Sequence, residues 1–109
     1  MKVSVVATSL CVAAALTAPA AHCGQDSRGA TLADRKGCYE CHEVGRTVVG
    51  PGFTQIAARY RFDPGAKEKL TEIIRVGGRG HWGDRFNMWP HTDLTDNQAR
   101  QLAEWVLEQ

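Results

Sequence analysis

Apolar side chains recur at intervals of three and four residues in several stretches of the chain, which is the spacing of one face of an α-helix. The stretches predicted to be helical on this basis are 53–60, 66–76 and 96–108, and a weaker pattern favours a fourth helix over 31–41. No stretch alternates apolar and polar residues as a half-buried strand does. The sequence therefore predicts an all-α fold of about four helices, with long loops over 43–52 and 77–94.

Turn and capping residues support these boundaries. Asp63 can cap the start of the second strongly patterned helix, Pro64 suits its first position, and Gly77-Gly78 stops it. Thr95 and Gln98 have the Thr-x-x-Gln spacing of a capping box at the start of the last helix.

Residues 1–20 have the features of a secretory signal peptide. A positive start precedes an apolar, uncharged run over 3–18, and small residues precede an expected cleavage site after Ala20. The run is shorter than the about 20 apolar residues that a membrane-spanning helix needs. We therefore expect export to the periplasm of a Gram-negative bacterium, with no membrane attachment after cleavage. A flexible tail is expected over 21–30 and the folded domain over 31–109.

Composition narrows the classes of function. The 109 residues include 13 Lys and Arg against 12 Asp and Glu. No basic stripe or block of like charge occurs, so a nucleic-acid partner has no support. Cleavage after Ala20 leaves 12 basic and 12 acidic side chains. A domain of this size buries little core by itself and usually needs a disulfide, a metal or a large cofactor.

One motif indicates that the stabilising group is a large cofactor. It is Cys38-Tyr39-Glu40-Cys41-His42, and Cys-x-x-Cys-His is the attachment signature of c-type haem. Two thiols three residues apart on a helical turn can bond one edge of a porphyrin, and His42 can then offer a nitrogen to the iron. A thioredoxin-like pair needs a βαβ pattern, a structural zinc site needs four ligands, and a disulfide across so short a loop is strained. We therefore predict one covalent haem c.

The iron has a second axial position, for which the residues alone leave several candidate ligands. Met88 is the only Met left after cleavage, and its neighbours are polar or aromatic rather than a helical stripe, which disfavours a role as core filler. The rivals are His81, His91 and His22, and an open position is a further alternative. Ligation by His and Met raises the reduction potential relative to two nitrogen donors.

Several motifs follow one another in an order that is more specific than the haem motif. They are Lys36-Gly37 before the first Cys, Val49-Gly50-Pro51-Gly52-Phe53, Ile56-Ala57-Ala58-Arg59-Tyr60, Gly80-His81-Trp82-Gly83 followed by Met88, and Leu102-Ala103-Glu104-Trp105-Val106-Leu107. With these motifs the chain resembles the small bacterial class I cytochromes c, in particular the cytochrome c-551/c-552 type. The resemblance extends over nearly the whole of the expected mature domain.

The resemblance implies roles for the matching positions. The two motif cysteines would carry the thioether bonds, with His42 and Met88 as the axial ligands of the iron. The carbonyl of Pro51 would accept a hydrogen bond from the other nitrogen of His42, and Trp82 would donate its indole N–H to a haem propionate. The side chains expected to pack around the ring are Val49, Phe53, Tyr60, Leu70, Ile74, Val76, Leu102 and Val106.

Three features depart from the family pattern. Asn87-Met88-Trp89-Pro90 stands where relatives usually have Pro-Met-Pro-Pro, and the spacing from Trp82 to Met88 is one residue longer. Ile73 stands where some relatives place a basic residue near the propionates, with Arg75, Arg79 and Arg85 as nearby substitutes. Cys23 is an additional cysteine, either inert or able to form an intermolecular disulfide.

With both axial positions filled, the iron cannot bind a substrate. The expected protein is therefore a soluble, monomeric one-electron carrier and not an enzyme. Its donor and acceptor proteins would dock transiently near the haem edge, on a surface that includes Val48 and Trp89. One alternative is a haem subunit bound to a periplasmic dehydrogenase, such as a sulfite-oxidising enzyme. If Met88 does not bind the iron, the other alternative is an open-site haem enzyme or gas sensor.

Overall fold

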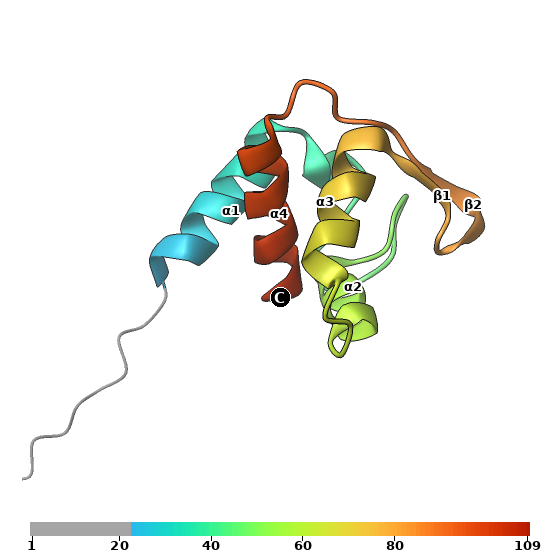
Figure 1. Ribbon diagram of the computed structural model, residues 1–109. Helices are drawn as coiled ribbons and strands as arrows, with labels where there is room; N and C mark the ends of the chain where they lie inside the picture. The colour runs from blue at the N-terminus through green and yellow to red at the C-terminus, as the bar shows by residue number, and fades with distance from the viewer. Residues whose placement is uncertain (1–22) are drawn as a thin grey trace, which may run out of the picture.

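The computed structural model describes residues 23–109, and the predicted signal peptide and His22 lie outside the described residues. The helices are α1 (Cys23–Arg35), η1 (Cys38–Glu40, a 3-10 helix), α2 (Phe53–Tyr60), α3 (Ala66–Val76) and α4 (Asp96–Leu107). Helix α4 contacts α1, α2 and α3, and Figure 1 shows it between α1 and α3. Within the described part of the chain, every helix is too short or too polar to cross a membrane.

The buried core lies where α4 meets the other helices. One face of α4 is fully covered, with Leu102 and Val106 2% and 6% exposed. Ala33 of α1 and Leu70 of α3 lie in the same core. The apolar surface of these side chains is removed from water in the folded state, and this burial is the main driving force that holds the helices together.

The helices predicted from apolar spacing are confirmed. Helices α2 and α3 have the expected boundaries, and α4 ends one residue earlier than expected. The predicted capping box is also present, because Thr95 Oγ1 accepts a hydrogen bond from the Gln98 N–H at 3.2 Å, and Gln98 Oε1 accepts one from the Thr95 N–H at 3.0 Å. Helix α3 differs in its cap: Gly65 holds the N-cap position, so Pro64 lies in the preceding turn and not in the helix.

The first helix differs from the prediction. It begins at Cys23 and ends at Arg35, so the flexible tail expected over 21–30 is helical from Cys23 onward. Gly37 has φ 72°, a left-handed conformation that ends the helical path before Cys38. The start of the helix was missed because no apolar pattern marks it in the sequence. Gly29 lies directly against Trp105 of α4, and a Cβ at this position would overlap the indole ring.

The loop expected over 77–94 contains a β-hairpin, so the prediction of no strand is wrong here. Strand β1 (Gly78–Gly80) pairs antiparallel with β2 (Gly83–Met88). Gly80 and Gly83, at the turn, both have positive φ, which favours glycine. Figure 1 shows the hairpin extending beyond α3, away from α1. The sequence shows no strand pattern here, because two of the three residues of β1 are glycine.

Candidate haem site

A cavity of about 600 Å³ opens between η1, the core helices and the hairpin. This volume lies within the about 300–1,000 Å³ of pockets that hold organic ligands. All the predicted site residues line it: Cys38, Cys41, His42, Val49, Pro51, Tyr60, Leu70, Ile74, Trp82 and Met88. Phe53, Leu102 and Val106 line it as well. Val76 does not, and is 58% exposed, because it lies two residues beyond Ile74 and therefore on another face of α3.

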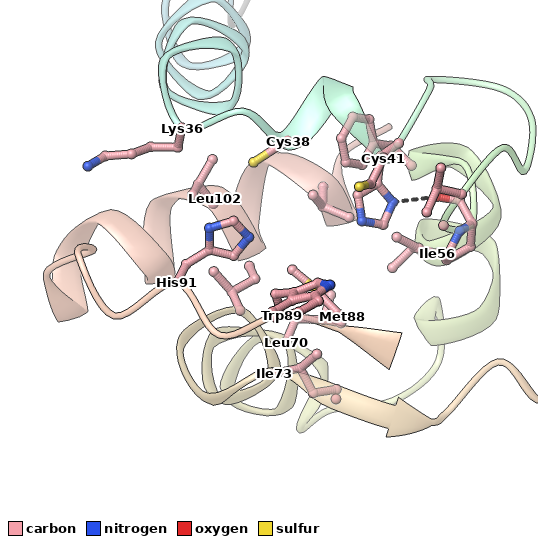
Figure 2. Close-up of a pocket in the computed structure, with 18 of the residues that line it drawn as sticks. Lys36, Cys38, Cys41, Ile56, Leu70, Ile73, Met88, Trp89, His91 and Leu102 are labelled. Carbon is pink, nitrogen blue, oxygen red and sulfur yellow. Dashed lines mark hydrogen bonds between the residues drawn. The ribbon is translucent and has the colours of Figure 1, made fainter. Parts of the chain in front are cut away.

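His42 is held in one orientation. Its Nδ1 lies 2.7 Å from the carbonyl oxygen of Pro51, as the dashed line in Figure 2 shows. Because a carbonyl can only accept, Nδ1 donates the proton and Nε2 keeps a free lone pair, as a metal-binding imidazole requires. The ring also stacks on Phe53, with centroids 5.3 Å apart. The ring also lies close to Gly50, where a Cβ would come within 2.6 Å of His42 Cε1.

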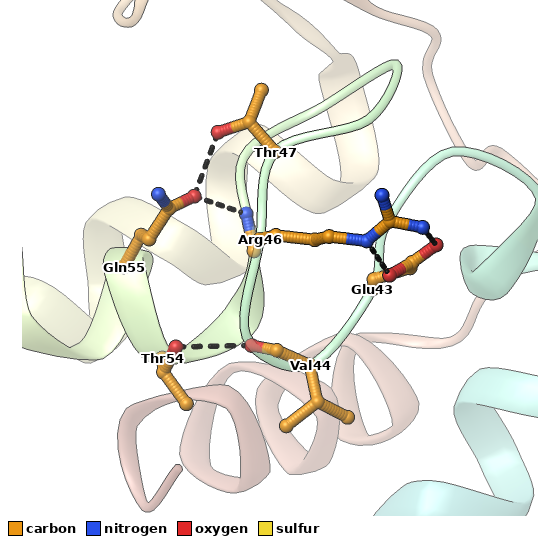
Figure 3. A network of polar contacts seen from close by, with 7 residues as sticks. Glu43, Val44, Arg46, Thr47, Thr54 and Gln55 are labelled. Carbon is orange, nitrogen blue, oxygen red and sulfur yellow. Dashed lines mark hydrogen bonds and ion pairs between the residues drawn. The ribbon is translucent and has the colours of Figure 1, made fainter.

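The loop that supplies the Pro51 carbonyl is tied down by polar contacts (Figure 3). Gln55 Oε1 accepts hydrogen bonds from the Thr47 hydroxyl and from the N–H of Gly52, both at 2.7 Å. Arg46 forms an ion pair with Glu43 inside the same loop, with Nε to Oε2 at 2.6 Å. The loop is thereby fixed to the first turn of α2, and the acceptor for His42 is fixed with it.

The two motif cysteines are free thiols. Cys38 is half-buried and Cys41 is exposed, and Figure 2 draws both sulfur atoms on the η1 side of the cavity. Burial raises the pKa of the Cys38 thiol. Two unpaired thiols, an oriented imidazole and an apolar lining fit a c-type haem. In residues 23–109 no three His, Cys, Asp or Glu side chains gather as a metal-binding group, so zinc has no comparable support.

The hairpin and the loop after it form the opposite side of the cavity. Met88, the last residue of β2, is half-buried and lies across the cavity from the cysteines (Figure 2). His81 and His91 line the cavity too. Trp89 also lines it and is 77% exposed. The geometry therefore brings Met88 and both described histidine rivals to the same cavity.

One cation near Trp82 was not anticipated. The guanidinium of Arg59 lies 4.5 Å from the centre of the Trp82 ring, a cation–π distance, and donates a hydrogen bond to the carbonyl of His81. Among the substitutes suggested by the sequence, Arg75 is paired with Asp96 at 3.1 Å. Arg59 could not be recognised in advance because its contacts are more than twenty residues away along the chain.

A second unanticipated contact lies in the cavity lining, to which His91 also belongs. Lys36 Nζ lies 2.7 Å from Asp93 Oδ2, and both residues line the cavity. The ammonium group of Lys36 holds the pKa of the Asp93 carboxyl below its ordinary value. The pair joins the segment before the haem motif to the loop after Met88, 57 residues away.

Comparison with known proteins identifies this arrangement. A family model for cytochrome c matches residues 27–109. The chain belongs to the cytochrome c family. It is 38% identical to cytochrome c-551 of Azotobacter vinelandii, over 72% of this chain and 94% of the relative. It is 37% identical to cytochrome c-552 of Nitrosomonas europaea, over 77% and 81%. The crystal structure of wild-type Nitrosomonas europaea cytochrome c552 matches with a TM-score of 0.69 and 38% identity, over 72% of this chain and 96% of that chain.

The family match confirms the class of fold and of function predicted from the sequence. This cytochrome has the class I fold, uses one covalent haem c and is an electron-transfer protein, not an enzyme. It exchanges electrons with redox partners. The comparisons do not favour the dehydrogenase-subunit, open-site enzyme or gas-sensor alternatives.

Proposed function

We propose that this cytochrome carries single electrons between proteins of the periplasm, with His42 and Met88 as the axial ligands of its haem. The observation that carries the proposal is the His42–Pro51 hydrogen bond of 2.7 Å, which leaves Nε2 free to bind a metal in a cavity that Met88 also lines. When bound, the haem supplies a one-electron couple between ferrous and ferric iron.

Each group around the cavity has a separate task. Cys38 and Cys41, free thiols here, would hold the haem through thioether bonds. Pro51 fixes the tautomer of His42, and Gly50 leaves the imidazole the space that it occupies. The apolar lining keeps water out and lowers the local dielectric, which favours the less charged, reduced state of the site. Trp82, which lines the cavity, would donate its indole N–H to a haem propionate.

Met88 is favoured over the two histidines by its position on the hairpin. Its backbone is paired with Gly78 in the strand register, so its side chain extends from a hydrogen-bonded element. In β2 it shares the half-buried side with Phe86. His81, by contrast, is exposed at the turn, and His91 lies in the loop beyond the hairpin. A ligand that stays bound in both oxidation states is best held on a rigid element.

The predicted export signal supports a periplasmic location, and the surface near the cavity supports transient contacts. Val48, Val49 and Trp89 are large apolar residues that are 39%, 64% and 77% exposed. Electron-transfer complexes are small and short-lived, and a modest exposed apolar area suits them. We propose that this rim meets donor and acceptor proteins in turn, and that the carrier is monomeric between encounters.

The assignment of Met88 is tested by absorption spectroscopy and potentiometry. The wild type and Met88→Ala are produced with a haem maturation system, with His81→Gln and His91→Gln as matched controls. The weak red band of Met sulfur on ferric haem is expected in the wild type and in both histidine variants. Met88→Ala is expected to lose the band, with a lower reduction potential. Persistence of the band in Met88→Ala, or ready carbon monoxide binding by the ferrous wild type, would contradict the proposal.

A further inference from the structure

We propose that the outer face of the β1–β2 hairpin is a docking surface for an acidic redox partner. The outer face is defined here by the exposed side chains of Arg79 and Arg85. The proposal rests on the proposed function and adds the chemistry of the partner. Figure 1 shows that the hairpin extends beyond the helices, where a second protein can reach it.

The strand register places the two arginines on one face. In β2, Phe86 and Met88 are half-buried while Arg85 and Asn87 are exposed, which is the alternation of a pleated strand. Arg79 is the cross-strand partner of Asn87 and therefore shares its face. By the same alternation, Asp84 falls on the side of Phe86. The outer face thus carries cations without a neighbouring acid on the same side of the hairpin.

These arginines differ from the cations on the helices. On α3 and α4, the basic side chains are neutralised in four ion pairs: Lys67–Glu104, Lys69–Asp63, Arg75–Asp96 and Arg100–Glu68. Over residues 23–109, neither Arg79 nor Arg85 forms an ion pair. Because the expected mature chain has equal numbers of basic and acidic side chains, the hairpin, with Arg79 and Arg85 against Asp84, is more positive than the chain as a whole.

Arg59 adds a third positive charge close to the hairpin. It is an exposed cation that bonds to the His81 carbonyl in the hairpin turn and stacks on Trp82. Its charge therefore lies beside the hairpin turn, and its contacts hold the turn against α2. A cationic surface of this kind attracts carboxylate-rich surfaces, raises the rate of encounter and orients the partner.

The patch is continuous with the redox site. The strand that carries Arg85 on its outer face carries Phe86 and Met88 on the face toward the cavity. Asn87 is exposed, is the cross-strand partner of Arg79 and also lines the cavity, so the outer face meets the edge of the cavity at this residue. The hairpin therefore joins recognition to electron transfer, and the exposed Trp89 follows directly after it.

The experiment compares two double variants that remove the same charge from different faces. Arg79→Gln with Arg85→Gln alters the hairpin, and Lys69→Gln with Arg100→Gln is the control on α3 and α4. The first measurement is the salt concentration that elutes each haem-loaded protein from a carboxymethyl matrix. The second is the rate of one-electron oxidation of the ferrous protein by ferricyanide, which becomes ferrocyanide, and by the cationic tris(phenanthroline)cobalt(III), which becomes cobalt(II).

The wild type is expected to be retained at low salt, and the hairpin variant to elute earlier than the control. The hairpin variant should also react about threefold to tenfold more slowly with ferricyanide at low salt, with no such loss toward the cobalt complex. Equal elution of the two variants, or no retention of the wild type, would overturn the proposal. Retention on vesicles of anionic phosphatidylglycerol but not on the carboxylate matrix would also overturn it, in favour of a lipid surface.

The two proposals fail in different ways. If the wild type gives no reversible one-electron wave at an electrode, the proposed function fails. Elution from the matrix requires no electron transfer, so it still decides whether the hairpin binds a carboxylate surface. Circular dichroism of all variants checks that the fold is retained, as expected for exposed side chains.

Discussion

The contact between Gly50 and His42 allows a sharp test of how the proximal side of the site is built. In Gly50→Ala, the new Cβ would lie 2.6 Å from His42 Cε1 and 3.0 Å from Nδ1. Carbon atoms in contact prefer about 3.5–4.0 Å, so the ring must move by about 1 Å. Gly50 has no positive φ, so the effect comes from the space the methyl group needs and not from the backbone conformation.

The displacement of the His42 ring affects both the stability of the fold and the ligation of the iron. Forcing a methyl group into a packed site costs about 1–3 kcal/mol. For a domain of this size, each kcal/mol lowers the melting temperature by about 4–8 °C. A ring displaced by about 1 Å also lengthens the 2.7 Å hydrogen bond to Pro51 and turns Nε2 away from its present direction. We therefore expect lower stability together with a perturbed ferric spectrum.

The assay is guanidinium unfolding, followed by haem absorption and by circular dichroism, with spectra of the folded ferric protein. Gly45→Ala is the matched control, because it lies in the same loop and an added Cβ there meets nothing within 4 Å. That variant should be neutral or slightly stabilised, since alanine restricts the unfolded chain. If Gly50→Ala and Gly45→Ala share the same midpoint and spectrum, the close packing of His42 against Gly50 is refuted.

Two further predictions concern parts of the fold outside the proximal loop. Gly29→Ala replaces a helical glycine, a change that normally stabilises by about 0.5–1 kcal/mol. Here it should destabilise by about 1–3 kcal/mol, because the Cβ would overlap Trp105; a raised melting temperature would contradict the packing of α1 on α4. Lys36 lowers the pKa of the Asp93 carboxyl from its ordinary value of 3.8. The ion pair therefore stabilises the fold above about pH 3.8, and this stabilisation is lost as the pH falls through the lower pKa of the folded state. Asp93→Asn should therefore be less stable than the wild type at neutral pH, and the two unfolding midpoints should converge in acid; a constant difference down to strong acid would show that the ion pair is not the cause.

Several features could be predicted because they depend on residues close together in the sequence. The haem motif places its three functional groups within five residues, and their chemistry needs no distant partner. The capping box of α4 joins Thr95 to Gln98, three positions along the chain. Helices α2 and α3 follow from apolar spacing, since one face of each must leave water. Position within the helix matters as well: Ile74 lines the cavity, but Val76 is turned away from it.

Other features were decided only by tertiary structure. The first turns of α1 have no apolar pattern in the sequence, and α1 lies close to Trp105 at Gly29, which has no side chain to obstruct the approach. The hairpin forms from a glycine-rich segment that has little strand propensity of its own.

The contacts around the cavity edge could not be predicted either, because they join residues that are far apart in the sequence. Arg59 meets the His81 carbonyl, and Lys36 meets Asp93, only after the chain has folded. A sequence pattern reports interactions over a few residues, where the backbone geometry is the same in every helix or strand. Contacts between distant residues depend on how whole elements pack, and that packing is what turns a haem-attachment motif into a lined cavity with a cationic hairpin at its edge.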